Sequence, residues 1–192
     1  DLYMGRPSDD IDIVVVGDAL QLAKSFIKLT KKRIQPSIYG TSGAVLVKWF
    51  HKEIEFNTAR GESYVRNSNE PQAIGTLEED LHRRDFTINA LAICLNKARF
   101  GELVDLFDGI WDLQDRIIDT PLHPDDTFED DPLRMFRAIR FATRLYFTIH
   151  QDVIDSIQRN KEHIKQIAPE RIAEEINKIM LSDNPSMGFE LL

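Results

Sequence analysis

The sequence of 192 residues has a single cysteine, no apolar run long enough for a membrane span and no excess of positive charge. One cysteine, Cys94, can form neither an internal disulfide nor a cysteine-rich zinc site, which favours a reducing, cytoplasmic setting. Because a bilayer span needs about 20 apolar residues in succession, no membrane association is expected. The net charge of −8 argues against a general electrostatic nucleic-acid binder of the histone type.

The residues that are present suit a folded chain. Hydrophobic residues make up 42% of the sequence and charged residues 29%, which is enough apolar mass for one or two packed domains. The N-terminal segment DLYMGRPSDD has neither the apolar core of a signal peptide nor an initiator methionine. We therefore expect the chain to begin inside a longer protein.

The first sixty residues predict a small α/β sheet. Residues 10–16 alternate between polar and apolar and then become β-branched, which predicts a strand. Asp18 is expected to cap a helix, because apolar residues follow at helical spacing over 19–29. Two further segments rich in β-forming residues, 44–50 and 54–60, are separated by a short turn and predict a hairpin.

The pattern becomes helical after residue 76. Thr76 and Glu79 form a capping box, and Asp85 is expected to cap a helix over 86–93. The other expected elements are a polar loop over 61–76, a strand or hairpin around 101–109, and helices over 133–147, 153–159, 170–181 and 186–192. The predicted fold is an N-terminal α/β (α+β) domain, residues 1–105, with a small mixed sheet, followed by an all-helical domain, residues 106–192.

Two aspartates on the first strand are candidate metal ligands. Asp10 and Asp12 are two residues apart, so their side chains leave the same face of the strand, about 6 to 7 Å apart at the backbone. Ile11, Ile13 and Val15 occupy the other face and are expected in the core. Carboxylates in this arrangement can share divalent ions. A solvated acidic edge strand is the alternative, and the same DxD pattern occurs in metal-dependent glycosyltransferases.

An arginine pair precedes the helix expected over 86–93. Arg84 beside the amides of a helix start can hold phosphate oxygens, through charge-assisted hydrogen bonds and the helix dipole. Asp85 and Asn89 are four residues apart and share a helix face. The alternative is that Asp85 only caps the helix while Arg83 and Arg84 form a solvated pair.

Residues 132–151 contain four arginines and no acidic residue. At about 100° per residue, Arg134, Arg137, Arg140 and Arg144 fall within half of the helix circumference, together with Asp131. Met135, Phe136, Ile139 and Ala142 lie on the opposite side and are expected to face the core. A plain amphipathic helix usually intersperses acids and lysines, so this composition favours a polyanionic ligand.

Carboxylates for a metal, an arginine at a turn and an arginine helix are the groups that phosphoryl transfer from a nucleoside triphosphate needs. The chain resembles the head and neck of class II tRNA nucleotidyltransferases, the CCA-adding enzymes, and the related bacterial poly(A) polymerases of the polymerase-β superfamily. The matching stretches are GRPSDDIDIVVVGD, IEFNTAR, GTLEEDLHRRDFTINALA, VDLFDGIWDLQDRII, EDDPLRMFRAIRFATR and ERIAEEINKIML.

The resemblance implies roles for specific residues. Asp10 and Asp12 would be the catalytic ligands of two Mg²⁺ ions, with Mn²⁺ as an alternative, and Glu55 is a candidate third carboxylate. Asp131 and Arg134 would read the base. The residues implied in nucleotide binding are Arg84, Asp85, Asn89, Asp131, Arg134, Arg137 and Arg140.

The chain departs from the family pattern at two places. The family motif begins with a Gly-Gly loop and reaches the first metal aspartate nine residues after an aspartate, and Asp1 lies nine residues before Asp10. The phosphate-contacting glycines are therefore expected to precede this sequence. The segment NSNEP, residues 67–71, has little of the basic character common in the family's flexible loop.

The resemblance implies a template-independent nucleotidyltransferase that adds CMP and AMP from CTP and ATP to tRNA 3′ ends. The alternatives are a poly(A) polymerase, an enzyme adding only part of CCA, or, in a different class, a nonenzymatic RNA-binding domain. The expected partner is tRNA, with no membrane or protein partner, and the RNA-binding body is expected to begin near the end of the chain.

Overall fold

The computed structural model describes all residues except 1, 7, 9, 32, 40–43 and 62–72. The chain divides into two compact units, Asp1–Asp80 and Leu81–Leu192. This division falls earlier along the chain than the domain boundary expected near residue 105, and that boundary stays a prediction. Among the described residues, no helix is both long and apolar enough to cross a membrane.

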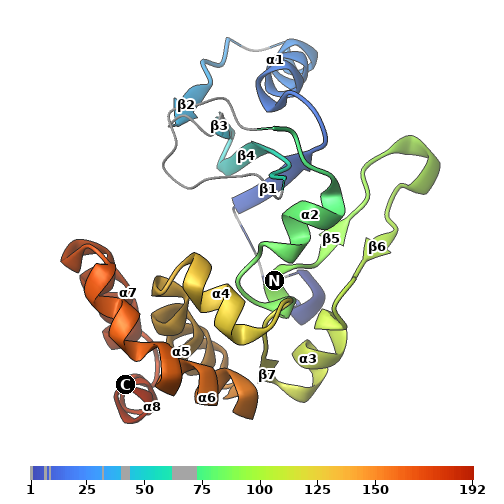
Figure 1. The fold of residues 1–192 in the computed structure, drawn as a ribbon. Coiled ribbons are helices and arrows are strands. Elements are labelled where there is room, and N and C mark those ends of the chain that lie inside the picture. The colour runs from blue at the N-terminus through green and yellow to red at the C-terminus, as the bar shows by residue number, and fades with distance from the viewer. Residues whose placement is uncertain (1, 7, 9, 32, 40–43, 62–72) are drawn as a thin grey trace. The chain divides into compact units, whose positions relative to one another are not determined.

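The first unit is built on a mixed four-stranded sheet in the order β1-β4-β3-β2 (Figure 1). β1 pairs in parallel with β4, whereas β4 with β3 and β3 with β2 are antiparallel. Its elements are the 3₁₀ turn η1 (Leu2–Met4), the strands β1 (Asp10–Val15), β2 (Ser37–Tyr39), β3 (Ala44–Trp49) and β4 (Lys52–Thr58), and the helix α1 (Ala19–Thr30). The strand, helix and hairpin expected for this region are therefore confirmed, and β2 is additional.

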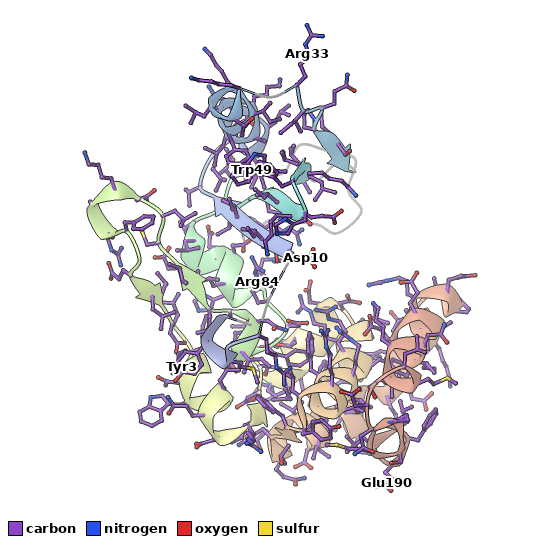
Figure 2. The ribbon with its side chains drawn as sticks, turned by 180° about the vertical axis from the view of Figure 1, so that it is seen from behind. Tyr3, Asp10, Arg33, Trp49, Arg84 and Glu190 are labelled. Atoms are coloured by element: carbon purple, nitrogen blue, oxygen red, sulfur yellow. The ribbon has the colours of Figure 1, made fainter. Side chains whose placement is uncertain are left out.

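Helix α1 covers one face of this sheet. The side chain of Asp18 accepts a hydrogen bond from the backbone N–H of Gln21 (3.0 Å), which caps the helix as expected. The buried cluster between helix and sheet contains Ala19, Ala23, Val45, Val47, Ile54 and Phe56. Trp49 lies on the same side, edge-on to Phe26 (Figure 2). Because α1 uses this face for the core, the opposite face of the sheet stays open for the acidic side chains.

The segment that follows β4 leads into helix α2 (Leu77–His82). The capping box at its start is confirmed: Thr76 N–H donates to Glu79 Oε2 (2.6 Å), and Glu79 N–H donates to Thr76 Oγ1 (3.1 Å). Most of the loop expected over 61–76, including NSNEP, lies outside the described residues.

The second unit is largely helical, as expected. Its helices are α3 (Gly109–Asp115), α4 (Pro124–Asp130), α5 (Leu133–Leu145), α6 (Gln151–Asn160), α7 (Pro169–Met180) and α8 (Pro185–Leu191). Short strands and 3₁₀ turns connect them, namely η2 (Thr87–Asn89), β5 (Ala92–Ile93), η3 (Lys97–Arg99), β6 (Leu103–Val104), β7 (Ile117–Ile118), β8 (Thr148–Ile149) and η4 (Lys161–Gln166). β5 and β6 form an antiparallel hairpin.

Helix α5 is the central helix of this unit and packs against α4, α7 and α8. Met135, Phe136, Ile139 and Ala142 are buried, which confirms the apolar face expected from the sequence. Arg134 and Arg140 are also buried, at 8% and 7% exposure, so two of the arginines do not form an exposed cationic face. A buried guanidinium requires a partner, and this requirement shapes the site described below.

The helix expected over 86–93 is wrong. The segment instead forms the three-residue turn η2 followed by strand β5. The side chain of Asp85 accepts from the N–H of Phe86 (3.0 Å) and pairs with Arg137, so it holds the chain in a tight turn rather than starting an α-helix. The helix dipole that was expected to favour phosphate beside Arg84 is therefore not supplied by this segment.

Replacing the buried Phe128 of α4 tests how strongly the core fixes the chain next to the arginine helix. Its side chain is 0% exposed, and truncation to alanine should lower the free energy of unfolding by about 3 to 5 kcal/mol because a cavity remains. Phe100→Ala is the matched control, since Phe100 is 74% exposed and its loss should cost less than about 0.5 kcal/mol. Urea denaturation measures both, and equal losses would contradict the assignment of Phe128 to the core.

Candidate active site

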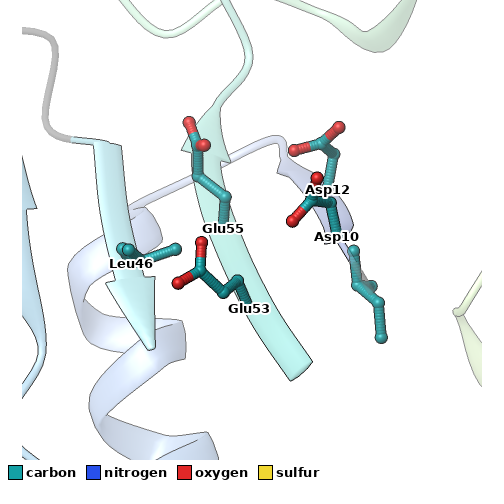
Figure 3. A pocket seen from close by; sticks show the side chains of 6 residues that line it. Asp10, Asp12, Leu46, Glu53 and Glu55 are labelled. Carbon is teal, nitrogen blue, oxygen red and sulfur yellow. The ribbon is translucent and has the colours of Figure 1, made fainter. Parts of the chain in front are cut away.

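Four carboxylates line one face of the sheet in the first unit, and we call them the carboxylate face. Asp10 and Asp12 of β1 are paired in register with Glu53 and Glu55 of β4. Because neighbouring strands lie about 4.8 Å apart and paired residues point the same way, each aspartate has a glutamate beside it. The four side chains line an open hollow of about 260 Å³ (Figure 3).

The four carboxylates differ in their partners. Glu53 forms an ion pair with Lys48 of β3 (2.5 Å), and Glu55 accepts a hydrogen bond from the side-chain amide of Asn57 (3.0 Å). Ile11, which was expected to face the core, is 41% exposed and contributes to the lining of the hollow. The reason is its place near the start of β1, an edge strand, beyond the reach of α1.

The donor set of the carboxylate face fits a hard divalent cation, since carboxylate oxygens are the ligands that such ions prefer. As the side chains stand, no three Asp, Glu, His or Cys residues in the described part of the chain converge on one point. Binding a cation there would therefore require these side chains to rotate toward a common point. Asp10, Asp12 and Glu55 are the ligands expected from the sequence, and Glu53 is already paired with Lys48.

In the second unit, each of three arginines of α5 pairs with a carboxylate from another segment, and we call this set the arginine network. Arg137 contacts Asp85 through Nε (2.7 Å) and Nη2 (2.6 Å). Asp85 also accepts from the side-chain amide of Asn89 (3.1 Å). Asp85, Asn89 and Arg137 are thus brought together, although not on the helix face that the spacing predicted.

Arg134 is held by the end of α4. Its Nη2 contacts Asp130 (2.7 Å) and donates to the carbonyl oxygen of Arg83 (2.8 Å), and its Nη1 donates to the carbonyl oxygen of Thr127 (3.2 Å). These contacts fix the plane of the guanidinium. Arg84, a half-buried residue of the same segment as Arg83, donates its backbone N–H to Leu81 (3.1 Å).

Asp131 caps helix α5 and faces α7. One carboxylate oxygen accepts from the N–H of Leu133 (3.2 Å), and the other pairs with Arg171 (3.1 Å). Its side chain is only 8% exposed. Asp131 thus lies between the end of α4 and the start of α5, and its role toward a base stays a prediction.

Arg140 and Glu175 form the most buried ion pair of the network. Nε of Arg140 lies 2.5 Å from Oε2 of Glu175, and the two side chains are 9% and 4% exposed. Burial lowers the pKa of the Arg140 guanidinium, although Glu175 opposes the shift. Burial alone would raise the pKa of Glu175, but the hydrogen bond from Lys178 and the charge of Arg140 hold that pKa below its ordinary value.

Comparison with known proteins gives the family. Residues 1–119 match the poly A polymerase head domain, and residues 146–192 match a module described as the probable RNA and SrmB-binding site of polymerase A. The chain belongs to the poly A polymerase head domain family. Nucleotidyltransferases of this family generally use divalent metal ions.

Two curated relatives and one solved structure illustrate the likeness. The CCA-adding enzyme of Lactobacillus delbrueckii subsp. bulgaricus is 36% identical over 99% of this chain and 46% of its own length. The A-adding tRNA nucleotidyltransferase of Aquifex aeolicus is 37% identical over 95% of this chain and 22% of its own. A tRNA nucleotidyltransferase complexed with a primer tRNA and an incoming ATP analog has a TM-score of 0.85 at 35% identity, over 99% of this chain and 53% of that one. The chain thus spans less than half the length of these two curated relatives.

Four residues that the sequence did not indicate belong to the carboxylate face or pair with members of the arginine network. Glu53 was not considered, although it stands two residues before Glu55 on the same strand. The others are the carboxylate or arginine partners Asp130, Arg171 and Glu175. The spacing of four between Asp130 and Arg134 was a usable signal, whereas the pairing of α7 with α5 required the fold.

Binding of Mn²⁺ tests the carboxylate face directly. Asp12→Asn removes a charge without changing the shape of the side chain, so the dissociation constant for Mn²⁺ should rise about tenfold or more, as measured by electron paramagnetic resonance. Glu53→Gln is the matched control, and its effect should be smaller because Lys48 already offsets that charge. Equal affinities for Asp12→Asn and the unmodified protein would exclude Asp12 as a ligand.

Proposed function

We propose that the intact protein is a template-independent tRNA nucleotidyltransferase that adds CMP and AMP from CTP and ATP to the tRNA 3′ end. The observation that carries this proposal is the carboxylate face on paired strands in a chain that also bears the arginine network and belongs to a nucleotide-polymerising family. The CCA-adding relative from Lactobacillus delbrueckii subsp. bulgaricus supports the choice of substrate.

Asp10 and Asp12, with Glu55, are proposed to hold the catalytic cations. Bound there, Mg²⁺, with Mn²⁺ as the alternative, would lower the pKa of the primer 3′-hydroxyl and neutralise charge on the α-phosphate and on pyrophosphate. The role of these residues is to fix two cations at adjacent strands of a rigid sheet. Lys48 keeps Glu53 out of this set.

Arg84, Arg137 and Arg140 are proposed to contact the triphosphate. Guanidinium groups form charge-assisted hydrogen bonds with phosphate oxygens, and those contacts carry no information about the base. Asp85 and Asn89 are proposed to complete the nucleotide site by orienting Arg137. The side chains of Arg137, Arg140, Asp85 and Asn89 are already held by protein partners, so little of their conformational entropy remains to be lost on binding.

Asp131 and Arg134 are proposed to select the base. Cytosine and adenine each offer an amino donor beside a ring-nitrogen acceptor, whereas uracil and guanine offer a carbonyl beside an N–H. An acceptor and a donor in fixed positions therefore fit the first two bases and mispair with the others. A carboxylate has about four lone-pair sites, so Asp131 can accept from a base while it keeps its contacts with Leu133 and Arg171.

One alternative has an observation in its favour. The Aquifex aeolicus relative is an A-adding enzyme at similar identity, so addition of the terminal A alone is the second candidate function. The partner we propose is tRNA, and the proposed compartment is the cytoplasm, where this substrate is processed.

Incorporation assays on tRNA transcripts ending before CC, C or A test the proposal. The intact protein should complete CCA on all three and should leave a generic RNA primer unextended. Asp12→Asn should abolish addition because too few anions remain to hold two cations. Addition of A alone to transcripts ending in CC would favour the A-adding reading, A tails on any RNA would favour a poly(A) polymerase, and binding without extension would favour an RNA-binding domain.

Arg137→Ala should raise KM for CTP and for ATP by a similar factor, about tenfold to a hundredfold, because a charge-assisted contact to phosphate is lost. Arg144→Ala is the matched control, since Arg144 is an exposed arginine of the same helix with no assigned contact to nucleotide, and its KM values should stay unchanged. Steady-state kinetics with each nucleotide measure both. A variant that lost only one of the two nucleotides would place Arg137 at the base instead.

A further inference from the structure

Helix α7 presents one cation and one anion toward α5, a single turn apart. Arg171 and Glu175 are spaced by four residues and therefore share a face of α7. Arg171 pairs with Asp131 at the start of α5, and Glu175 pairs with Arg140 two turns further along it. The charges of α7 are thus complementary to Asp131, which precedes α5, and to Arg140 within α5, two residues with different proposed tasks.

The contact of Arg171 decides how the carboxylate of Asp131 is oriented. Leu133 N–H holds one oxygen and Arg171 Nη2 holds the other, so rotation of the carboxylate would break at least one contact. Loss of Arg171 would remove the contact that holds this second oxygen. The carboxylate could then turn and offer its acceptor in more than one direction.

The contact of Glu175 fixes a different group. Its two oxygens are both used, one by Arg140 Nε (2.5 Å) and the other by Lys178 Nζ (2.9 Å). The Arg140 guanidinium also stacks over the ring of Phe141, 4.1 Å from its centroid. Nε of Arg140 is therefore directed at α7, and the ring of Phe141 limits the tilt of the guanidinium plane. Together these two contacts set the direction of the Nη groups of Arg140.

We propose that Arg171 and Glu175 are positioning residues with separable effects: Arg171 governs base selection through Asp131, and Glu175 governs triphosphate affinity through Arg140. This inference rests on the proposed function. Helix α7 has no proposed contact with the nucleotide. Through these two residues it would nevertheless control both which nucleotide is used and how tightly that nucleotide is bound.

The test compares kcat/KM for CTP, ATP, UTP and GTP in the intact protein with Arg171→Gln and Glu175→Gln. Arg171→Gln should lower the preference for CTP and ATP over UTP and GTP about tenfold, as expected when a fixed hydrogen-bond pattern is lost. Glu175→Gln should raise KM for CTP and ATP together by about tenfold and leave the preference unchanged. Arg171→Lys keeps the positive charge and should restore most of the preference.

Arg159→Gln is the matched control for Arg171. Arg159 pairs with Asp125 at 3.0 Å and is 54% exposed, against 3.1 Å and 45% for Arg171, so both substitutions break a similar ion pair. Nucleotide preference should not change in Arg159→Gln. Circular dichroism checks folding, and if Arg171→Gln does not fold, Arg171→Met and Arg159→Met replace the pair, with a loss of preference expected only in Arg171→Met.

Three results would overturn the inference. An unchanged preference in Arg171→Gln would remove its link to base selection, and the same loss in Arg159→Gln would show a general effect of destabilisation. A change of preference in Glu175→Gln would show that the two contacts are not separable. If the unmodified protein incorporates neither CMP nor AMP, the proposed function itself fails and the inference fails with it, which distinguishes the two cases.

Discussion

The charge on the arginines of α5 must be neutralised where these side chains are buried, and much of the second unit is arranged around that constraint. Asp85, Asp130 and Glu175 come from three segments, and each is tied to α5 by the arginine it pairs with. Removing one member of a buried pair leaves an uncompensated charge, which costs far more than the net gain from forming the pair. The same contacts that connect the segments therefore also fix the groups proposed to meet the nucleotide, so stability and function share one set of residues.

Strong local signals made part of the fold predictable. The cap at Asp18 and the capping box at Thr76 correspond to contacts that the structure contains, because each depends on residues close together in the chain. The segment 86–93 has an equally good local helix signal, but Asp85 is engaged by Arg137 from far along the sequence. Here a tertiary ion pair outweighed local propensity, and no reading of the segment alone could have shown this.

The candidate site residues were likewise predictable only where local sequence spacing identifies them. Asp10 and Asp12 could be identified from their spacing, whereas the place of Glu53 and Glu55 beside them depends on the register of β1 against β4. Residues 132–151 contain no acid, which favoured a polyanionic ligand for the arginines, but carboxylates from other segments pair with three of them. Glu175 is 35 residues from Arg140, and Asp85 is 52 from Arg137. Such pairings follow from the packing of helices, which composition does not reveal.

The parallel pairing of β1 with β4 also bears on how the first unit folds. The hairpin of β3 and β4 can form locally, but β1 must return from a distant part of the chain, which requires closure of a long loop. That closing step brings two aspartates against two glutamates, and their mutual repulsion opposes it. The cation proposed for this face would relieve the repulsion, and folding of the sheet would then depend on cation concentration. The carboxylate face would in that case link the completion of the fold to the availability of its inorganic ligand.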